Sequence, residues 1–312
     1  MGHHRGVPPE QVEEFAVHRP SGALAGVAPM ICGYRELGLA PGVHRGLPSP
    51  YLTLIITLDE PCTVAIHPDP GQPGDSYPAL VGGLHVRPAL VTHDGAQSGV
   101  QVALNPLAAR AVLGVPAGEL VMRDLHLDQL IGAAAHRLRE QLGAAAGWPE
   151  RFAIVEGFLR DRIAGGAGAG AAAGGSVRRE VRGVWSRVIA QRGVVRIDEL
   201  ARAAGWSSRH LGEQFRRELG LSPKTAARVV RFDAARRRLP HTVATGGGVA
   251  ELACASGYAD QAHLTRDFRE FAGLAPRAWW AAEFRNLQSG TGSDGAASGH
   301  ALDVWREDHV DL

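Results

Sequence analysis

Arginine, glutamine and histidine side chains recur at matched places in the second half of the chain. Gln261 and His263 lie near the start of a segment with helical spacing, and Arg266 follows one turn later. Arg209 and His210 lie near the start of an earlier segment of the same kind. Glutamine can pair with adenine and arginine with guanine in the DNA major groove, each pair contributing about 1–3 kcal/mol of discrimination. These residue types, placed on helix faces, indicate recognition of bases in double-stranded DNA.

The residues around these side chains form an internal repeat. Residues 198–216 read DELARAAGWSSRHLGEQFR, and residues 251–269 read ELACASGYADQAHLTRDFR. In each copy Leu-Ala is followed by glycine and an aromatic residue, then by His-Leu, and then by Phe-Arg. Two short helices around a turn that contains Gly205 or Gly257 are typical of a helix-turn-helix, whose second helix can enter a major groove. The repeat therefore predicts two helix-turn-helix units.

The exposed face of each second helix supplies the candidates for base contact, because the N-terminal part of that helix meets the base edges. Gly212 has no side chain, and Glu213 can only accept from cytosine or repel phosphate. We therefore expect the second copy to dominate specificity, with Arg209 as the main reader in the first. A solvated helix face is the alternative for Arg209, Gln261 and Arg266. The candidates are Ser208, Arg209, Gly212 and Glu213 in the first copy and Gln261, Ala262, His263 and Arg266 in the second.

Basic residues near the repeat are candidates for phosphate contacts, which supply affinity and salt dependence but little sequence information. A helix predicted from Pro223 to about Leu239 lies between the copies, with Ser222 as its N-cap. About 16 residues at 1.5 Å each give a spacer of roughly 24 Å. With the supporting helices, this spacer could place the two second helices one DNA turn apart, near 34 Å. The phosphate candidates are His210, Arg216, Arg217, Lys224, Arg228 and Arg269.

The formal net charge of +1 conceals an uneven distribution of charge. Residues 176–285 carry 20 Lys and Arg against 11 Asp and Glu, whereas residues 1–175 carry 12 against 16 and residues 286–312 carry one against five. A basic block beside acidic neighbours indicates a polyanionic partner for that block. A merely solvated arginine-rich surface is the alternative, and the repeat inside the block favours DNA.

The first half of the chain has the pattern of a β domain followed by helices. Short stretches rich in β-formers and separated by glycine and proline run through residues 23–105, and residues 51–58 are the densest of them. They predict an antiparallel β-sandwich or small barrel. Residues 107–113, 127–142 and 148–163 have helical spacing of apolar residues. The predicted fold class is α+β in two domains, the second an all-α domain of two helix-turn-helix subdomains joined by a long helix.

Composition also divides the chain into five parts. Residues 164–176 are almost wholly glycine and alanine, which raises the entropic cost of a helix and indicates a flexible linker. The predicted parts are a mobile lead-in (1–20), the β domain with its helices (21–163), the linker (164–176), a DNA-binding domain (177–285) and a flexible acidic tail (286–312).

The cysteines and the apolar runs indicate the compartment. Cys32, Cys62 and Cys254 are far apart and form no Cys-x-x-Cys pair, which argues against a structural zinc or a disulfide framework and fits a reducing compartment. No apolar run approaches the roughly 18 residues of a membrane span, and the N-terminus lacks the apolar region of a signal peptide. We expect a cytoplasmic, nucleoid-associated protein with no metal, no cofactor and no membrane contact.

Residues 180–282 resemble the DNA-binding domain of the AraC/XylS family of transcriptional regulators. The resemblance rests on residues 197–217, 220–223, 249–269 and 273–277, and its most specific part is GYADQAHLTRDFR from Gly257 to Arg269. It implies two helix-turn-helix subdomains that read adjacent major grooves of double-stranded DNA at a promoter. It also implies an activator or a repressor, with RNA polymerase as a further partner of an activator.

The family's base contacts transfer unevenly onto this sequence. They transfer well to Arg209, Gln261 and Arg266, and poorly to Gly212 and Glu213, where other members often carry longer polar or basic side chains. The junction at residues 240–248, expected here as an irregular loop, is longer than usual for the family.

The N-terminal region resembles, more weakly, the cupin-like sensing domains of this family, notably at residues 42–49. This resemblance implies that residues 21–163 bind a small-molecule effector and form a homodimer. His44 and Arg45 are the candidates for effector contact, with a hydrogen bond at a strand end as the alternative. The histidines considered for a pocket are His44, His67, His85 and His93, which lack the His-x-His spacing of metal-binding cupins.

Two other functions remain open on the sequence. The first is an enzyme with a DNA-binding appendage, either a cupin-type oxygenase or a DNA-alkylation repair protein. Such repair needs a metal-activated cysteine cluster, which the spacing of Cys32 and Cys62 does not provide. The second is a nucleoid protein that binds DNA without sequence preference.

Overall fold

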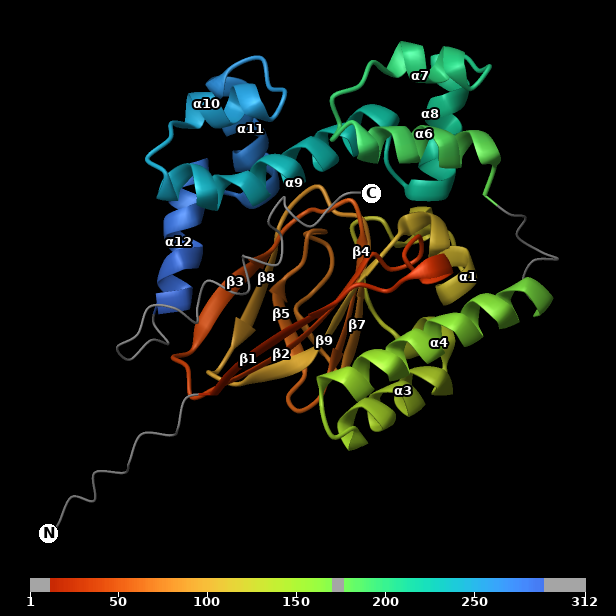
Figure 1. Ribbon diagram of the computed structural model, residues 1–312, viewed down its shortest axis with the longest axis vertical. Coiled ribbons are helices and arrows are strands. Elements are labelled where there is room, and N and C mark those ends of the chain that lie inside the picture. Colours follow the sequence, from red (N-terminus) through yellow and green to blue (C-terminus); the bar gives the residue numbers. More distant parts are fainter. Residues whose placement is uncertain (1–11, 170–176, 289–312) are drawn as a thin grey trace, which may run out of the picture.

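The computed structural model describes residues 12–169 and 177–288. The predicted lead-in up to residue 11, residues 170–176 of the predicted linker and residues 289–312 of the predicted tail lie outside the described residues. Strands fill the first third of the chain, and helices make up the rest (Figure 1). The prediction of an α+β, two-domain chain is confirmed.

The β domain consists of two antiparallel sheets that form a sandwich. The six-stranded sheet has the order β1-β2-β9-β4-β7-β10, and the four-stranded sheet has the order β3-β8-β5-β6. Of the two arrangements expected for this region, the sandwich is therefore the one observed. The strands are β1 (Val12–His18), β2 (Met30–Leu37), β3 (Gly42–Gly46), β4 (Leu52–Thr57), β5 (Cys62–Ile66), β6 (Asp75–Tyr77), β7 (Ala79–Gly82), β8 (Ala89–His93), β9 (Gln97–Leu104) and β10 (Asp124–His126).

Buried and less buried side chains alternate along the central strands, and this alternation explains the core of the sandwich. Leu52, Leu54 and Ile56 of β4 are fully buried, and the residues between them are less so. Val100 and Val102 of β9 pair with Ile56 and Leu54 and are equally buried. Because successive side chains of a strand point to opposite faces, this pattern gives the six-stranded sheet one continuous apolar face.

The predicted lead-in is wrong between residues 12 and 18, which form the edge strand β1. Phe15 of β1 pairs with Tyr34 of β2 in an antiparallel register. His18 stacks on Phe152 at 5.4 Å between ring centroids and contacts Glu156 at 2.7 Å, so this strand is fixed by a helix far along the chain. The residues of segment 1–20 alone do not reveal this contact with a helix more than 130 residues away, so the strand was not predicted.

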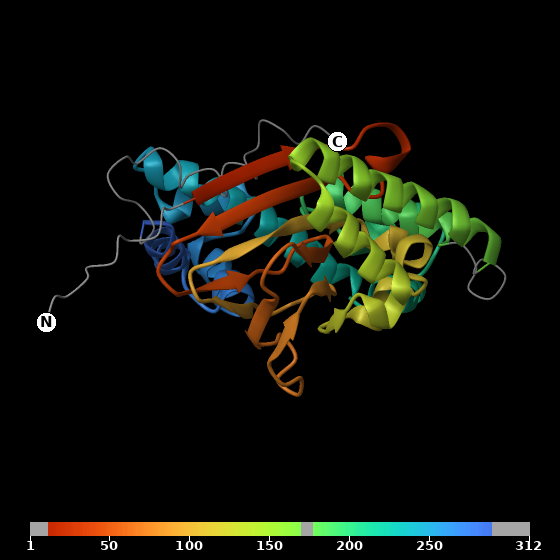
Figure 2. The same cartoon turned by 90° about the horizontal axis from the view of Figure 1, so that it is seen from below.

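Short helices follow the sandwich and cover one end of it. The predicted helical segments are confirmed, with different boundaries, as α1 (Ala109–Leu113), α2 (Asp128–Ile131) with α3 (Ala133–Ala144), and α4 (Trp148–Ala169). Helix α4 continues into the first residues of the predicted linker. Figure 2 shows α3 and α4 together at one side of the sheets, with α12 (Pro276–Gln288) at the other. Three 3-10 turns lie at Gly22–Leu24, Pro106–Ala108 and Ala117–Leu120.

The second domain contains the two predicted helix-turn-helix units. In both, the turn glycine (Gly205 or Gly257) has φ = 71°, a conformation that side chains disfavour. Ser207 and Asp260 cap the second helices by accepting from the backbone N–H groups of His210 and His263. The helices are α6 (Arg179–Ala190), α7 (Ile197–Ala203), α8 (Ser208–Leu219), α9 (Pro223–Ala244), α10 (Val249–Ala255) and α11 (Gln261–Ala272).

The connecting helix α9 is longer than the sequence indicates, so the irregular loop predicted at residues 240–248 is wrong for residues 240–244, and only residues 245–248 are non-helical. The helix continues through Pro240 to Ala244. Leu239 is buried in the core of the second unit, and the Thr242 hydroxyl donates to the Arg238 carbonyl at 3.1 Å. Packing on both sides thus holds the helix together across a residue that removes a backbone donor. With 22 residues, α9 spans about 33 Å.

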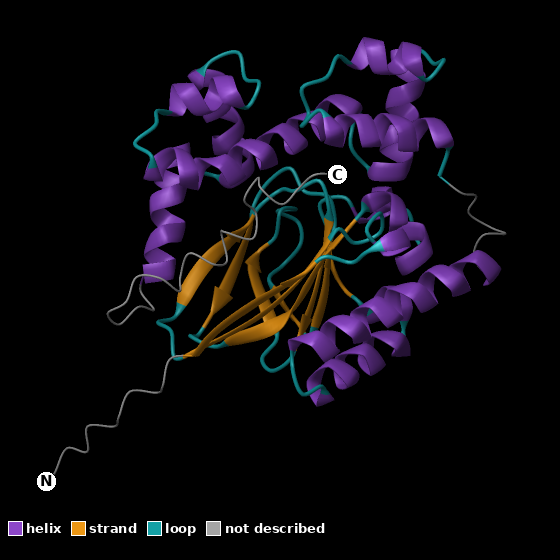
Figure 3. Cartoon of the chain, viewed as in Figure 1, coloured by secondary structure: helices purple, strands orange, loops and turns teal. Residues whose placement is uncertain are grey.

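The two domains are packed against one another (Figure 3). One apolar core joins the β domain and the first unit and includes Ile31, Leu120 and Phe215. Gly118 lies so close to α8 that a Cβ there would be 2.5 Å from the Arg217 carbonyl oxygen. Such a shared core fixes the orientation of the first helix-turn-helix relative to the sheets.

Candidate DNA-binding surface and ligand cavity

The two helix-turn-helix units lie at opposite ends of α9. Figure 1 shows α7 and α8 over one end, α10 and α11 over the other, and the sheets on the opposite side of α9. Each unit packs its own core beneath the second helix, through Leu211 and Phe215 in α8 and through Leu264 and Phe268 in α11. The remaining faces of α8 and α11 are therefore turned away from the core.

Most of the predicted base-contacting residues lie on these outward faces. Ser208, Arg209 and Glu213 of α8 are exposed, as are Gln261, Ala262 and Arg266 of α11. The backbone of Gly212 is buried. An ideal Cβ there would meet only the Arg216 guanidinium, at 3.4 Å, so the position has room for a side chain. A depression of ≈ 390 Å³ lies around it, lined on α8 by Ser208, Arg209 and Glu213 and on α9 by Lys224.

The two matched histidines pack against the turn of their own unit. His210 contacts Trp206 edge-on at 4.8 Å between ring centroids, and His263 contacts Tyr258 in the same way at 5.1 Å. Both imidazoles are half-buried. The repeat of His and aromatic residue therefore corresponds to a repeated packing contact, which leaves one edge of each ring toward solvent.

Arg209 is not isolated on its helix. Its Nε donates to Glu213 Oε1 at 3.1 Å, an ion pair between residues four apart on the exposed face. Such exposed pairs contribute little stability, about 0.3–0.5 kcal/mol. The carboxylate nevertheless reduces the positive potential of the first recognition helix where it faces outward.

The predicted phosphate contacts fall into two groups. Arg216, Arg217, Lys224 and Arg269 are exposed. Arg228 is turned inward: its guanidinium contacts Asp267 at 2.7 Å and Glu270 at 2.6 Å and lies over the Phe271 ring at 4.9 Å.

The ion pairs of Arg228 join α9 to α11. Asp267 is almost fully buried, and Arg228 is its ion-pair partner there. The hydrogen bonds that Arg228 donates to Glu270 raise the pKa of Arg228, against the lowering effect of burial. The geometry gives Arg228 a structural role in placing α11 on α9.

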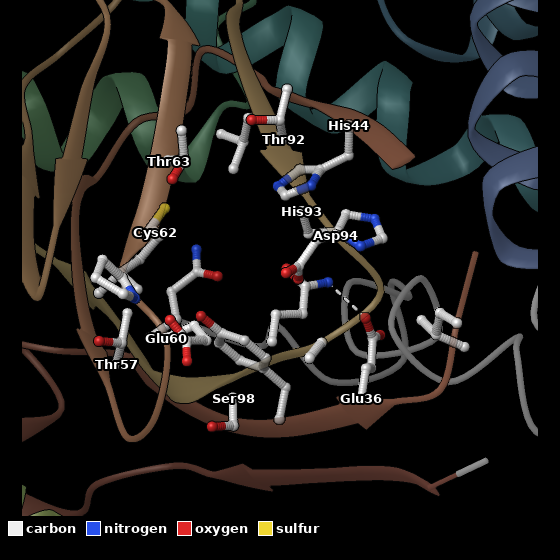
Figure 4. Close-up of a pocket in the computed structure, with 18 of the residues that line it drawn as sticks. Glu36, His44, Thr57, Glu60, Cys62, Thr63, Thr92, His93, Asp94 and Ser98 are labelled. Carbon is white, nitrogen blue, oxygen red and sulfur yellow. Dashed lines mark hydrogen bonds between the residues drawn. The ribbon is translucent and has the colours of Figure 1, made fainter. Parts of the chain in front are cut away.

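A cavity of ≈ 860 Å³ lies between the two sheets of the β domain. Side chains of β1, β2, β4 and β9 form one wall, and side chains of β3, β5, β6 and β8 form the other. In Figure 4 the labelled side chains surround one open space, with Glu36, His93 and Asp94 on one side and Glu60 and Cys62 on the other. Its volume lies within the roughly 300–1,000 Å³ of small-molecule sites.

The two predicted effector residues relate differently to this cavity. His44 lines it, and burial together with the neighbouring His93 lowers the pKa of His44 to about 4. Arg45, the next residue of β3, instead pairs with Glu283 of α12 at 3.6 Å, and Glu283 does line the cavity. Glu283 was not predicted, because no pattern in residues 276–288 marks one glutamate as facing a distant sheet.

The other histidines considered for a pocket gather elsewhere in the β domain. His67 Nδ1 lies 2.7 Å from Asp124 Oδ2, His85 Nε2 lies 3.4 Å from Asp124 Oδ1, and Tyr77 contacts His67 at 3.3 Å. His67, Tyr77 and Asp124 are buried and His85 is half-buried, and the cluster ties β10 to the loop after β5. No group of three or more His, Cys, Asp or Glu that could hold a metal ion occurs among residues 12–169 and 177–288. In the same residues, no helix has the length and apolarity needed to cross a membrane.

Comparison with known proteins decides the nature of the second domain. Residues 200–282 match the family model of a helix-turn-helix domain. The C-terminal domain is a helix-turn-helix domain of the AraC type. The match covers both units and α9, which are the parts that the internal repeat predicted.

Solved structures resemble this chain over most of its length at low identity. ToxT from Vibrio cholerae is 11% identical, with 86% of this chain and 98% of that chain covered and a TM-score of 0.43. ToxT bound to an unsaturated fatty acid is 11% identical over 88% and 97%, with a TM-score of 0.45. The AraC-like transcriptional activator CuxR is 17% identical over 75% and 89%, with a TM-score of 0.29. A comparison with curated proteins finds no match.

Proposed function

We propose that this protein is a transcriptional regulator that reads two successive major grooves of a specific DNA site and responds to a small molecule in its β domain. The observation that carries the proposal is the placement of α8 and α11 at the two ends of a 22-residue helix. Both helices expose residues that read bases, and the spacer of about 33 Å is close to the roughly 34 Å of one DNA turn.

The base contacts are proposed to be unequal. Gln261 and Arg266 on α11 are exposed and suited to adenine and guanine. On α8 only Arg209 is suited to a purine, and Glu213 holds it in an ion pair. The second unit therefore supplies most of the specificity, and exposed cations such as Lys224 and Arg269 supply affinity through phosphates.

The cavity is the proposed effector site. His44 lines it, and Glu283 of α12 brings a residue of the DNA-binding domain to its edge. ToxT has been solved with an unsaturated fatty acid. The ligand class proposed for this chain rests instead on the residues that line its own cavity. The homodimer, the contact with RNA polymerase and a place of action at the bacterial-type nucleoid stay predictions.

The DNA-alkylation repair form of the enzyme alternative is not favoured by the cysteines on which it depends. Cys32 and Cys62 both line the cavity. Burial raises the pKa of Cys32 to about 12 and that of Cys62 to about 11, the latter helped by the charge of Asp124. Both thiols are therefore protonated at neutral pH, and a thiol is a much poorer nucleophile than a thiolate.

The proposal is tested by selecting bound sequences from a random DNA library and comparing the preferred site with scrambled DNA. Arg266→Ala is expected to weaken binding to the selected site by about 10-fold or more, and binding to scrambled DNA far less. Arg137→Ala is the control, because Arg137 is an exposed arginine on α3, far from the recognition helices. Selection that yields no enriched sequence would support the nucleoid protein instead.

A further inference from the structure

The cavity walls carry one sign of charge. Six acidic residues line the cavity, and within the described part of the chain no Lys or Arg does. Only one of the six, Glu283, has an ion-pair partner among the described residues. The six are Glu13, Glu14, Glu36, Glu60, Asp94 and Glu283.

Apart from Arg45 beside Glu283, the neighbouring groups in the described residues give this negative charge no cationic partner. Glu36 accepts a hydrogen bond from the Gln97 amide, which is neutral. Glu14 accepts one from the Trp148 indole at 3.0 Å, on the face of the sheet opposite Tyr34 and Glu36, so its carboxylate is turned away from the cavity. His44 adds no positive charge at neutral pH, because its pKa is lowered to about 4. The pKa of Glu13 is raised by burial and by the charge of Glu36, so the carboxylates disfavour one another.

One carboxylate oxygen in the wall lacks a hydrogen bond. Glu283 Oε1 is buried and accepts none, and the Arg45 guanidinium lies 3.6 Å away, beyond hydrogen-bond distance. Burial raises the pKa of Glu283 in spite of Arg45. A buried acceptor without a donor is costly, and a donor supplied from the cavity would satisfy it.

The remaining wall is apolar and aromatic. Phe15 and Tyr34 line the cavity beside Ile55, Leu39 and Val91. Burial raises the pKa of Tyr34, and the charge of Glu36 raises it further, so its hydroxyl stays neutral. Aromatic faces attract cations and apolar walls hold a hydrocarbon body.

We propose that the cavity binds an organic cation, an ammonium group carried on an apolar body, with Glu36 and Glu283 among the carboxylates that receive the charge. The inference rests on the proposed effector-binding role of the β domain and names the class of its ligand. A ligand with a carboxylate head would meet like charges such as those of Glu13 and Glu36 and no Lys or Arg among the described lining residues, which costs free energy instead of contributing it.

Isothermal titration calorimetry of the full chain with three matched probes tests the proposal. Decylamine, decanol and decanoate share one apolar chain and differ only in the charge of the head group. We expect decylamine to bind at least tenfold more tightly than decanol, and decanoate to bind least. Equal or tighter binding of decanoate, or no binding of decylamine up to millimolar concentration, would overturn the proposal.

Charge-removing variants distinguish the cavity from the protein surface. Glu36→Gln and Glu283→Gln are each expected to weaken decylamine binding about tenfold, the loss of one charged hydrogen bond. Glu140→Gln is the matched control, because Glu140 is exposed on α3 and does not line the cavity. Decylamine binding that is equal in all three variants, with melting temperatures like that of the wild type, contradicts a site at these carboxylates.

The test is separable from the proposed function. DNA binding by the amine-free protein reports on the helix-turn-helix units alone. Amine binding without specific DNA binding would leave the cavity assignment intact and remove the regulatory role. Specific DNA binding together with a preference for decanoate would leave the DNA-binding role intact and overturn the assignment of the cavity to organic cations.

Discussion

Arg45 of β3 and Glu283 of α12 face each other at 3.6 Å, and they connect the sandwich to the last described helix of the DNA-binding domain. Glu283 also lines the cavity between the sheets. The second helix-turn-helix packs its core on α12 through Trp279, which lies 6.1 Å from Phe268 of α11 between ring centroids. Glu283 at the cavity is therefore connected, through α12 and the contact between Trp279 and Phe268, to the helix that carries Gln261 and Arg266.

Replacing Arg45 should loosen this connection. Arg45→Gln is expected to lower the free energy of unfolding by about 1 kcal/mol, because the pair is partly exposed. Backbone amides of α12 should exchange with solvent faster, while those of α3 stay unchanged. Hydrogen exchange measured by mass spectrometry checks this. Unaltered exchange throughout α12 would show that Arg45 does not hold the helix.

Asp233 should make the protein sensitive to acid. Burial raises its pKa, but Arg237 and Arg236 lower it more, and the net pKa lies below the ordinary value. An acid with a lowered folded-state pKa contributes stability above its unfolded-state pKa, and this contribution is lost as pH falls through the folded-state pKa. Asp233→Asn is expected to cost about 3 kcal/mol at neutral pH.

Urea unfolding of wild type and Asp233→Asn at several pH values measures that difference. It should be largest at neutral pH and shrink as the pH falls below about 4. A difference that stays constant down to pH 2 would contradict the ion pairs of Asp233 with Arg236 and Arg237.

Arg228 and Arg269 should separate a structural arginine from a phosphate contact. Arg228→Ala leaves the buried Asp267 without its partner and is expected to destabilise the fold by about 3 kcal/mol. Arg269→Ala removes an exposed charge and should leave the melting temperature within about 1 °C, while it reduces the salt dependence of DNA binding. Denaturant melts and DNA titrations at several salt concentrations measure both. A stable Arg228→Ala variant with weakened DNA binding would assign Arg228 to phosphate contact after all.

Glu213 should restrain the first recognition helix. Glu213→Gln removes a carboxylate from the outward face and frees Arg209 from its ion pair. We expect DNA affinity to rise several-fold at low salt, with a smaller rise at high salt because the effect is electrostatic. Glu199→Gln on α7 is the matched control, since Glu199 is equally exposed and pairs with Arg196 on the flank of the unit. Weaker binding by Glu213→Gln would instead indicate that this carboxylate accepts from a cytosine.

Local patterns predicted the parts of the molecule that depend on near neighbours. The repeat of Leu, Gly, His and Phe located both helix-turn-helix units, because each is a self-contained packing unit with its own turn glycine and N-cap. The continuation of α9 through Pro240 was not predicted. A proline usually ends or kinks a helix, but here the packing of Leu239 in the core of the second unit outweighs that tendency.

The cavity was beyond reach of the sequence for a different reason. Its carboxylates come from β1, β2, the turns around residues 60 and 94, and α12, so their proximity follows from sheet pairing and domain docking. His44 was selected by type and position, but its role as a neutral wall depends on burial beside His93. Charge counts had shown an acidic first half without showing where that charge gathers.

The two recognition helices are predicted to occupy successive major grooves, and methylation interference on the selected DNA site tests this directly. The predicted result is two clusters of interfering guanines or adenines, centred about 10 base pairs apart on one face of the duplex. Arg266→Ala should erase the interference in one cluster and leave the other. A single cluster, or two clusters on opposite faces of the duplex, would contradict the arrangement of α8 and α11 on α9.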